Sequence, residues 1–189
     1  MILKGGRTMI EYYPISYEKN YLYVAGFEQE TMVDGPGIRF GIFLQGCYRH
    51  CKGCHNQETW STDKDILDKC KISFDDILDK INKSKLITGL TFSGGEPILQ
   101  SAGIVEFIEY IKEKTNKNFD IMFFTGYTKD ELEELSVVDI NIKKLLELSD
   151  RFIDGPFIEE EKSQSKKFRG SLNQMYWIKN KDQFVNGDE

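Results

Sequence analysis

The sequence is poor in histidine and proline and has no long uncharged apolar run. Its 189 residues include 2 histidines, 4 prolines and 4 cysteines. No segment approaches the roughly 18 apolar residues of a membrane-spanning helix, and Met1 to Tyr13 lacks the apolar stretch of a secretory signal. Basic residues number 25 against 31 acidic ones, so the net charge of −6 offers no attractive field to a nucleic-acid backbone. We therefore expect a cytoplasmic protein that binds neither a membrane nor nucleic acid.

Chain length and composition favour one domain. A chain of 189 residues with 40% hydrophobic content can bury one core and is short for two. We therefore predict a single domain over residues 1–189. Within it, residues 1–12 are expected to be peripheral, and the polar run 159–167 is expected to be a mobile surface loop.

Four apolar segments have the pattern of strands and alternate with helical patterns. Ile38 to Gln45 alternates every second residue, as in a strand that is covered on both faces. The other expected strands are 86–93, 119–124 and 151–154, and the expected helix starts are Ser73, Pro97 and Thr128. The order β-α-β-α-β-α-β predicts an α/β fold with parallel strands and right-handed crossovers. The carboxyl ends of such strands share one rim of the sheet, where we expect the functional site.

Three of the four cysteines form a cluster with the spacing Cys-x3-Cys-x2-Cys. They are Cys47, Cys51 and Cys54. Three thiolates from one loop can hold three irons of a 4Fe-4S cluster and leave the fourth iron open for a ligand. A zinc site that adds His50 or His55 is the alternative. Structural zinc usually takes two separated pairs of ligands, which this sequence lacks, so the spacing favours the cluster, and we expect Cys70 to be a buried small apolar residue.

The motifs around this loop resemble those of the radical S-adenosylmethionine superfamily, and within it those of the glycyl-radical-enzyme activating proteins. The segment 33–39 precedes the cysteine strand, Cys54-His55-Asn56 closes the loop, and 91–97 reads Thr-Phe-Ser-Gly-Gly-Glu-Pro. The back half is similar to the branch that activates anaerobic ribonucleotide reductases, through the segments 124–127, 153–157 and 169–174. The small residue Gly53 also fits this branch, since many members of the wider superfamily carry an aromatic residue there.

This resemblance implies a fold, two cofactors and a reaction. The fold is a partial (open) parallel β/α barrel, and the cofactors are a 4Fe-4S cluster and S-adenosyl-L-methionine. The reaction is reductive cleavage of S-adenosylmethionine to form a glycyl radical on the large subunit of an anaerobic ribonucleoside-triphosphate reductase, with a one-electron donor such as flavodoxin. The alternatives are a pyruvate formate-lyase activase or another glycyl-radical activase, and a non-enzymatic zinc-binding module. No side-chain acid or base is required for hydrogen-atom abstraction, in keeping with the lack of an evident Ser-His-Asp arrangement.

Five residues are expected to bind S-adenosylmethionine. They are Gly94, Gly95, Glu96, Asp154 and Arg39. The resemblance assigns the Gly-Gly turn to the methionine amino group, which glycine lets approach the backbone. Plain turns are the alternative at 94–97, at Asp154 and at 34–37. Arg39 lies in a buried strand and needs a partner or a ligand anion, which favours a place in the site. The resemblance marks 169–174 as a site rim or a partner contact.

Overall fold

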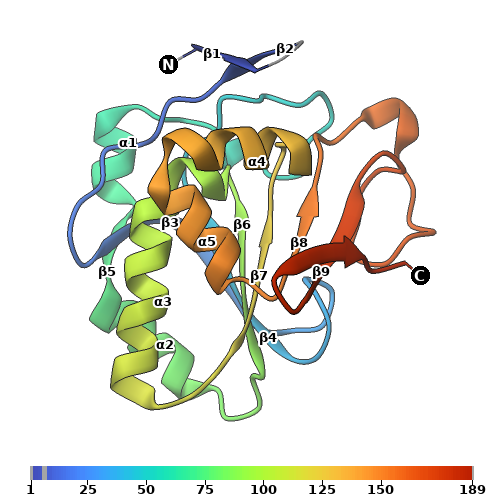
Figure 1. The fold of residues 1–189 in the computed structure, drawn as a ribbon. Coiled ribbons are helices and arrows are strands. Elements are labelled where there is room, and N and C mark those ends of the chain that lie inside the picture. The colour runs from blue at the N-terminus through green and yellow to red at the C-terminus, as the bar shows by residue number, and fades with distance from the viewer. Residues whose placement is uncertain (1, 6–7, 189) are drawn as a thin grey trace.

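An eight-stranded mixed sheet is the centre of the computed structural model, which describes residues 2–5 and 8–188 (Figure 1). The strand order is β10-β9-β8-β7-β6-β4-β3-β5. The four middle strands are parallel and are β4 (Arg39–Leu44), β6 (Gly89–Gly94), β7 (Asp120–Phe124) and β8 (Arg151–Asp154). Three of these strands lie within the predicted segments and β6 extends one residue beyond its segment 86–93, and their parallel pairing confirms the α/β class.

The strands at both edges of the sheet are antiparallel to their neighbours. They are β3 (Tyr21–Thr31) and β5 (Lys71–Ser73) at one edge, and β9 (Met175–Asn180) and β10 (Gln183–Asn186) at the other. The prediction of parallel strands therefore holds for the middle of the sheet and is wrong at its edges. The second half of β3 is largely exposed and β10 alternates between exposed and half-buried residues, so neither carries the continuous apolar run of a central strand.

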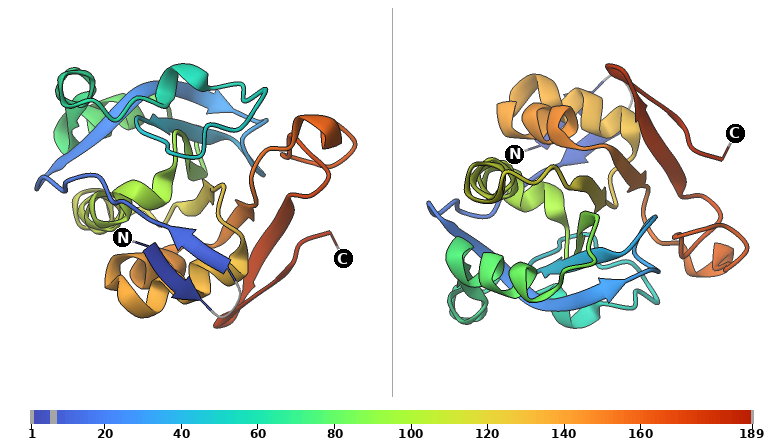
Figure 2. Two further views of the ribbon diagram at one scale, coloured as in Figure 1. Left: turned by 90° about the horizontal axis from the view of Figure 1, so that it is seen from above. Right: turned by 90° about the horizontal axis from the view of Figure 1, so that it is seen from below.

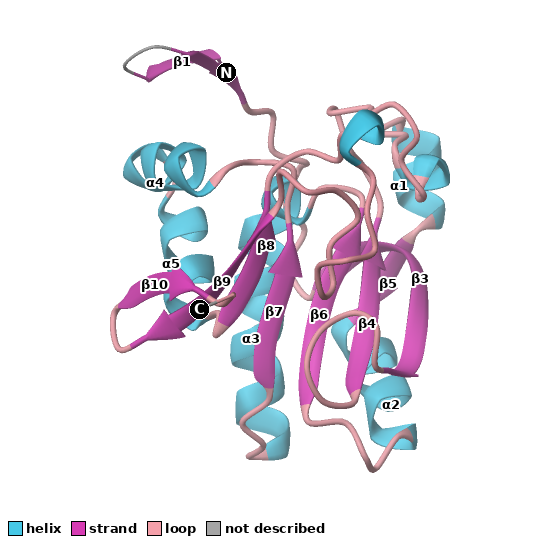
Figure 3. Cartoon of the chain, turned by 90° about the vertical axis from the view of Figure 1, so that its right-hand side faces the viewer, coloured by secondary structure: helices cyan, strands magenta, loops and turns pink. Residues whose placement is uncertain are grey.

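The helices pack on one face of the sheet, and the loops that follow the parallel strands gather at one end (Figure 3). The helices are α1 (Lys64–Lys69), α2 (Phe74–Lys83), α3 (Ser101–Thr115), α4 (Lys129–Val138) and α5 (Ile140–Leu148), with short 3-10 turns η1 (Gln57–Thr59), η2 (Pro97–Gln100) and η3 (Glu159–Glu161). The expected starts are confirmed: the Ser73 hydroxyl caps α2, and Thr128 forms a capping box with Glu131 at α4. Pro97 begins η2, which runs directly into α3. No helix in the described part of the chain is long and apolar enough to cross a membrane.

The two faces of the parallel strands differ in character. Toward the helices they present buried apolar side chains that pack against α3 and α5, among them Phe40, Ile42, Leu90, Phe92, Phe123 and Phe152. The rings of Phe123 and Phe152 stack with centroids 5.1 Å apart. The opposite face carries Arg39 and Thr91 near the amino ends of the strands and a small apolar cluster around Met122 and Ile153. The helix side therefore supplies the core, which leaves the other side free for polar and functional groups.

The amino-terminal segment is tied to the domain more firmly than the sequence predicts. β1 (Ile2–Gly5) and β2 (Thr8–Glu11) form a separate hairpin that lies in front of the orange helices α4 and α5 when seen from above (Figure 2). Ile10 and Tyr12 are nevertheless buried in the main core. The Tyr12 hydroxyl donates to Asp139 over 2.7 Å, and the Tyr127 hydroxyl donates to the carbonyl of Glu11 over 2.7 Å. The expectation that all of 1–12 is peripheral is thus wrong for its last residues.

Candidate active site

A pocket of about 130 Å³ forms where the ends of the four parallel strands meet. Its walls come from Cys47, Arg49, Cys51, Cys54 and Trp60 after β4, Ser93 to Glu96 around the end of β6, Phe124 to Gly126 around the end of β7, Gly155 and Phe157 after β8, and Gln174 before β9. These segments are distant in sequence and adjacent in space. The prediction that functional segments converge at the carboxyl ends of the strands is therefore confirmed.

The cysteine loop is held in shape by its own backbone. The amide of Gly46 donates to the carbonyl of Thr59 over 2.7 Å, and the amide of Cys47 donates to that of Trp60 over 3.0 Å. Within the loop, the amide of Cys54 donates to the carbonyl of Cys51 over 3.1 Å. The η1 turn and the residues after it thus close the loop, and all three cysteines line one pocket.

Burial disfavours ionisation of two thiols of this loop, those of Cys47 and Cys51. Desolvation, with a smaller effect from the negative charge of Glu96, raises the pKa of Cys47 to about 12. Burial also raises the pKa of Cys51. A cation bound by the sulfurs reverses this effect, since a coordinating thiol is deprotonated outright. Binding of a metal group by Cys47 and Cys51 would therefore release their protons.

The two histidines of the loop are engaged in ring contacts. The His50 ring lies over Trp60 with centroids 4.7 Å apart, and the His55 ring lies 5.8 Å from that of Phe157. In residues 2–5 and 8–188, no three His, Cys, Asp or Glu side chains are already grouped so that they could hold a metal ion. This holds for the three thiols of the loop as well as for sets that include a histidine, so the side-chain positions alone do not distinguish zinc from a cluster.

The Gly94-Gly95 turn packs against the backbone that leads into the cysteine loop. Gly94 has a φ of +88°, and a Cβ there would lie 2.7 Å from the amide nitrogen of Leu44. A Cβ on Gly95 would lie 2.4 Å from the carbonyl oxygen of Gly46. The amides of Gly95 and Glu96 donate to the carbonyls of Leu44 and Gly46, both over 2.8 Å. The backbone of this turn therefore lies so close to residues 44–46 that both positions require glycine. Approach of a ligand to the turn would be a second reason for glycine there.

This packing gives a sharper prediction for Gly95→Ala. The resemblance predicts that a bulky side chain at Gly94 or Gly95 weakens S-adenosylmethionine binding before it harms the cluster. Because the new methyl group must push Gly46 away, and Gly46 directly precedes Cys47, we expect the variant to lose iron after anaerobic reconstitution as well as S-adenosylmethionine affinity. Iron analysis and calorimetric titration of the reconstituted variant measure both losses. Normal iron content with normal affinity would show that the neighbouring loop yields without cost.

Glu96 joins the turn after β6 to the turn after β7. Its side chain is buried, and Oε1 accepts hydrogen bonds from the Thr125 hydroxyl at 2.8 Å and the amide of Ile98 at 3.1 Å. Oε2 accepts from the amide of Gly126 at 2.8 Å. Burial raises the pKa of Glu96, opposed by the positive charge of Arg49 and by these hydrogen bonds. A fixed carboxylate thus lies beside the cysteines, where it can accept a hydrogen bond from a ligand ammonium.

Comparisons with known proteins agree with this geometry. The sequence profile of the 4Fe-4S single cluster domain family matches residues 33–177. The anaerobic ribonucleoside-triphosphate reductase-activating protein of Haemophilus influenzae is 35% identical over 152 residues, covering 76% of this chain and 90% of that protein. The protein of the same name from Escherichia coli K12 is 32% identical over 150 residues with the same coverage of both chains. The chain belongs to this family of reductase-activating proteins.

Two further similarities cover less of the molecule. The pyruvate formate-lyase-activating enzyme of Listeria monocytogenes is 43% identical over 90 residues, which are 44% of this chain and 35% of that enzyme. The crystal structure of QueE from Escherichia coli is similar with a TM-score of 0.46 and 19% identity, covering 57% of this chain and 53% of that one. The match to the reductase-activating proteins is the one that spans most of both sequences.

In this member of the reductase-activating family, the segment 169–174 fixes the loop that follows β8. The Gln174 side chain accepts hydrogen bonds from the amides of Gly170 and Ser171 and donates to the carbonyl of Gly155 over 3.1 Å. The Asn173 amide donates to the carbonyl of Pro156 over 2.8 Å. Since Gly155 and Gln174 both line the cysteine pocket, this segment builds one wall of the site. The 3-10 turn η3 lies in the expected mobile segment, and its Glu159 pairs with Lys52 at 2.9 Å.

Asp154 points away from the cysteine pocket. Its Oδ2 accepts from the amide of Lys129 at 2.7 Å, in the first turn of α4, and its Oδ1 accepts from the amide of Met175 at 3.1 Å, at the start of β9. Burial raises the pKa of Asp154, while these hydrogen bonds lower it. Of the two readings of Asp154 from the sequence, the geometry favours the one in which it stabilises the turn.

Arg39 lies at the opposite end of β4 from the cysteines. Its Nε donates to Thr91, and its two amino groups donate to the Asp120 carboxylate at 2.7 Å and to the carbonyls of Pro36, Leu90 and Asp120. All five donors are therefore used within the protein. These bonds also anchor the 34–37 turn to the sheet. Because Arg39 lies at the far end of β4, the structure does not bring it together with the other expected cofactor residues.

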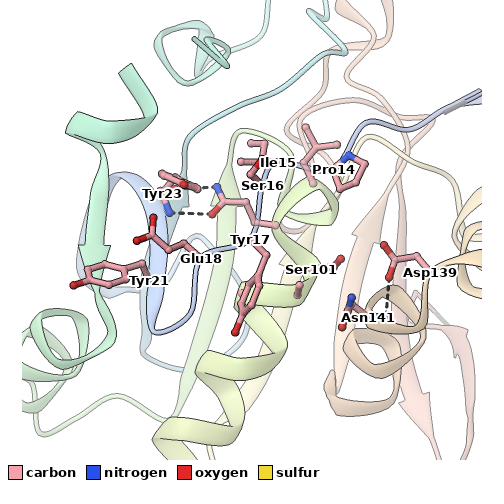
Figure 4. A pocket seen from close by; sticks show the side chains of 14 residues that line it. Pro14, Ile15, Ser16, Tyr17, Glu18, Tyr21, Tyr23, Ser101, Asp139 and Asn141 are labelled. Atoms are coloured by element: carbon pink, nitrogen blue, oxygen red, sulfur yellow. Dashed lines mark hydrogen bonds between the residues drawn. The ribbon is translucent and has the colours of Figure 1, made fainter. Parts of the chain in front are cut away.

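A second pocket, of about 300 Å³, lies apart from the cysteines beside the start of α3 (Figure 4). Tyr17, Tyr23 and Asp139 are among its walls. The Gln100 side chain bonds both the amide and the carbonyl of Tyr23, and Asp139 accepts from Tyr12 and from the amide of Asn141. Its polar groups thus hold the fold together. The pocket is larger than the cysteine pocket, so size alone does not identify the active site.

Two features of the site environment were missed or misjudged from the sequence. Arg49 and Tyr127 form a cation-π contact at 4.2 Å beside the pocket, which no local motif indicates because 78 residues separate them. Cys70, expected to be a buried apolar residue, is only partly buried, and its sulfur lies 3.8 Å from the side-chain oxygen of Gln45. Only contacts across the fold make these features visible.

Proposed function

We propose that Cys47, Cys51 and Cys54 hold a 4Fe-4S cluster in the pocket at the strand ends. Three points support this assignment: the Cys-x3-Cys-x2-Cys spacing, the place of all three cysteines in the wall of one pocket, and the match of residues 33–177 to the 4Fe-4S single cluster domain family. Three thiolates leave one iron of a cubane without a protein ligand. That iron is the place for S-adenosylmethionine in this proposal.

The protein's own residues position the cofactors and shield them. When bound, the cluster and S-adenosylmethionine supply one-electron cleavage of the sulfonium and, through it, hydrogen-atom abstraction. The turn 94–96 presents backbone and the Glu96 carboxylate to the methionine ammonium. Trp60 and Phe157 form apolar walls beside the cysteines, which help to exclude water and oxygen.

The partner in this proposal is the anaerobic ribonucleoside-triphosphate reductase, on which the protein generates a glycyl radical. The observation that carries this choice is the similarity to reductase-activating proteins over about nine tenths of their length. Four parallel strands bordered by antiparallel ones fit a partial barrel with an open side, through which a glycine loop of the large subunit can reach the cofactors. A one-electron donor such as flavodoxin supplies the reducing equivalent.

Partner choice is tested by the yield of glycyl radical. The reconstituted protein, with S-adenosylmethionine and a reductant, is expected to produce a glycyl radical on the reductase of its own organism and little on pyruvate formate-lyase. Hydrogen abstraction requires near-contact, so a loop misplaced by an ångström or so loses most of the rate. Electron paramagnetic resonance measures both yields side by side. Equal yields would contradict the choice of the reductase as the specific partner, and the opposite preference would favour the pyruvate formate-lyase alternative suggested by the Listeria enzyme.

A further inference from the structure

Two side chains of opposite charge, Arg49 and Glu96, lie on the boundary between two adjoining pockets. Both line the pocket of the three cysteines, and both line a neighbouring pocket of about 280 Å³ that Tyr127 and Glu131 also border. Arg49 belongs to the cysteine loop and lies between Cys47 and Cys51 in sequence. A cation and an anion therefore flank the space next to the proposed cluster.

The guanidinium of Arg49 is held in place from three directions. It stacks over the Tyr127 ring with 4.2 Å between Cζ and the ring centroid. Its Cδ packs on the backbone of Gly126, where a Cβ would lie only 2.7 Å away. Its Nη2 donates to Glu131 over 3.2 Å, which is long for a charge-assisted bond and uses one of five N–H donors. The guanidinium of Arg49 is thus held in one position, and most of its N–H donors remain available to a ligand.

The amino-acid part of S-adenosylmethionine is a zwitterion, with an ammonium and a carboxylate on one carbon. The buried carboxylate of Glu96 can bind the ammonium group of S-adenosylmethionine, but it cannot bind the carboxylate group of that ligand. Arg49 offers the matching cation on the same pocket boundary, and guanidinium is the side-chain group that best fits a carboxylate. A carboxylate has two oxygens, so it can bind the open iron and Arg49 at once.

We propose that Arg49 binds the carboxylate of S-adenosylmethionine and selects ligands that carry a complete α-amino acid group. This inference rests on the proposed function, because it needs S-adenosylmethionine in the cysteine pocket. The incoming carboxylate replaces Glu131 as the partner of Arg49, and Glu131 keeps its capping bond with the amide of Thr128 at 2.8 Å. The capping box at the amino end of α4 therefore stays intact.

The test compares two ligands on the cluster-loaded protein with the cluster oxidised, so that no cleavage occurs. S-adenosylmethionine carries the amino-acid group, and 5′-methylthioadenosine lacks it. In Arg49→Gln, calorimetric titration is expected to show at least about tenfold weaker binding of S-adenosylmethionine. Binding of 5′-methylthioadenosine is expected to change by less than about twofold, and iron content is expected to match the wild type.

Two matched variants complete the test. Lys52→Gln removes a neighbouring cation of the same loop, whose partners are Glu159 and Glu160, and is expected to leave both affinities unchanged. Glu131→Gln removes the charge that competes for Arg49 and is expected to keep or improve S-adenosylmethionine binding. The role of Arg49 alone would be overturned by any of three results. Arg49→Gln could leave the S-adenosylmethionine affinity unchanged or weaken the binding of both ligands equally. Glu131→Gln could weaken S-adenosylmethionine binding as much as Arg49→Gln does. A wild-type protein that binds no S-adenosylmethionine would overturn the proposed function together with it.

Discussion

Alanine at Cys47, Cys51 or Cys54 is expected to abolish the iron–sulfur cluster and all cleavage of S-adenosylmethionine. Each sulfur is the sole protein ligand of one iron in the proposed cubane, so loss of any one leaves two irons exposed. The wild type is expected to bind about four irons and four sulfides per chain after anaerobic reconstitution. Iron and acid-labile sulfide analysis, with 5′-deoxyadenosine as the product assay, measures the loss.

Cys70→Ala is the matched control for these variants. Its sulfur contacts Gln45 and does not line the cysteine pocket, so the variant is expected to keep the full cluster. Stoichiometric zinc without sulfide in the wild type would contradict the cluster assignment. So would an intact, active cluster in any of the three alanine variants of the loop.

Asp120→Ala is expected to lower the free energy of unfolding by about 3–5 kcal/mol, because it leaves the fully buried Arg39 without its carboxylate. Asp120 also pairs with Arg151 at 2.5 Å, so one carboxylate on β7 serves two guanidinium groups, one on β4 and one on β8. Urea unfolding of the variant and the wild type, measured in parallel, gives the difference. Asp68→Ala, which removes an exposed partner of Lys64, is the control and is expected to leave the free energy of unfolding nearly unchanged.

The same network predicts a loss of stability in acid. Burial by itself raises the pKa of Asp120, but hydrogen bonds from Arg151 and Arg39 outweigh it and hold the pKa below its ordinary value. A carboxyl group with a lowered folded-state pKa contributes its full stability above the unfolded value of about 3.9. That contribution disappears as the pH falls through the lower folded-state pKa. As the pH is lowered through this range, the free energy of unfolding of the wild type is therefore expected to decrease more steeply than that of Asp120→Ala.

Pattern and motif predicted the parts of the molecule that depend on neighbours in sequence. The four parallel strands are continuous apolar runs, and the caps at Ser73 and Thr128 follow from residues three positions apart. The cysteine loop and the 94–96 turn were also found in this way. The edge strands β3 and β10 were not, since partial exposure gives them no distinctive pattern.

Residues whose role depends on distant partners could be recognised but not placed. An arginine in a buried strand was correctly expected to need a counter-charge, yet Asp120 lies 81 residues away and no local signal links the two. The bond from Gln174 to the carbonyl of Gly155 was equally hidden, because the two residues are 19 positions apart and meet only after the chain has folded back. The stacking of Arg49 on Tyr127 belongs to the same class. The residue types indicated which side chains need partners, but the long separation of the partners in the sequence prevented their identification.

The span between Cys47 and Gln174 has a consequence for how the protein matures. Both residues line the cysteine pocket, and synthesis delivers the chain to solution from its amino end. The three proposed ligands therefore emerge long before Gly155 and Gln174 complete the walls around them. During that interval the thiols lack their shield against oxygen, and the turn that packs on Gly46 has yet to be fixed by the strands beyond it. A nascent chain stalled before β9 would therefore expose these cysteines without the wall that Gln174 completes.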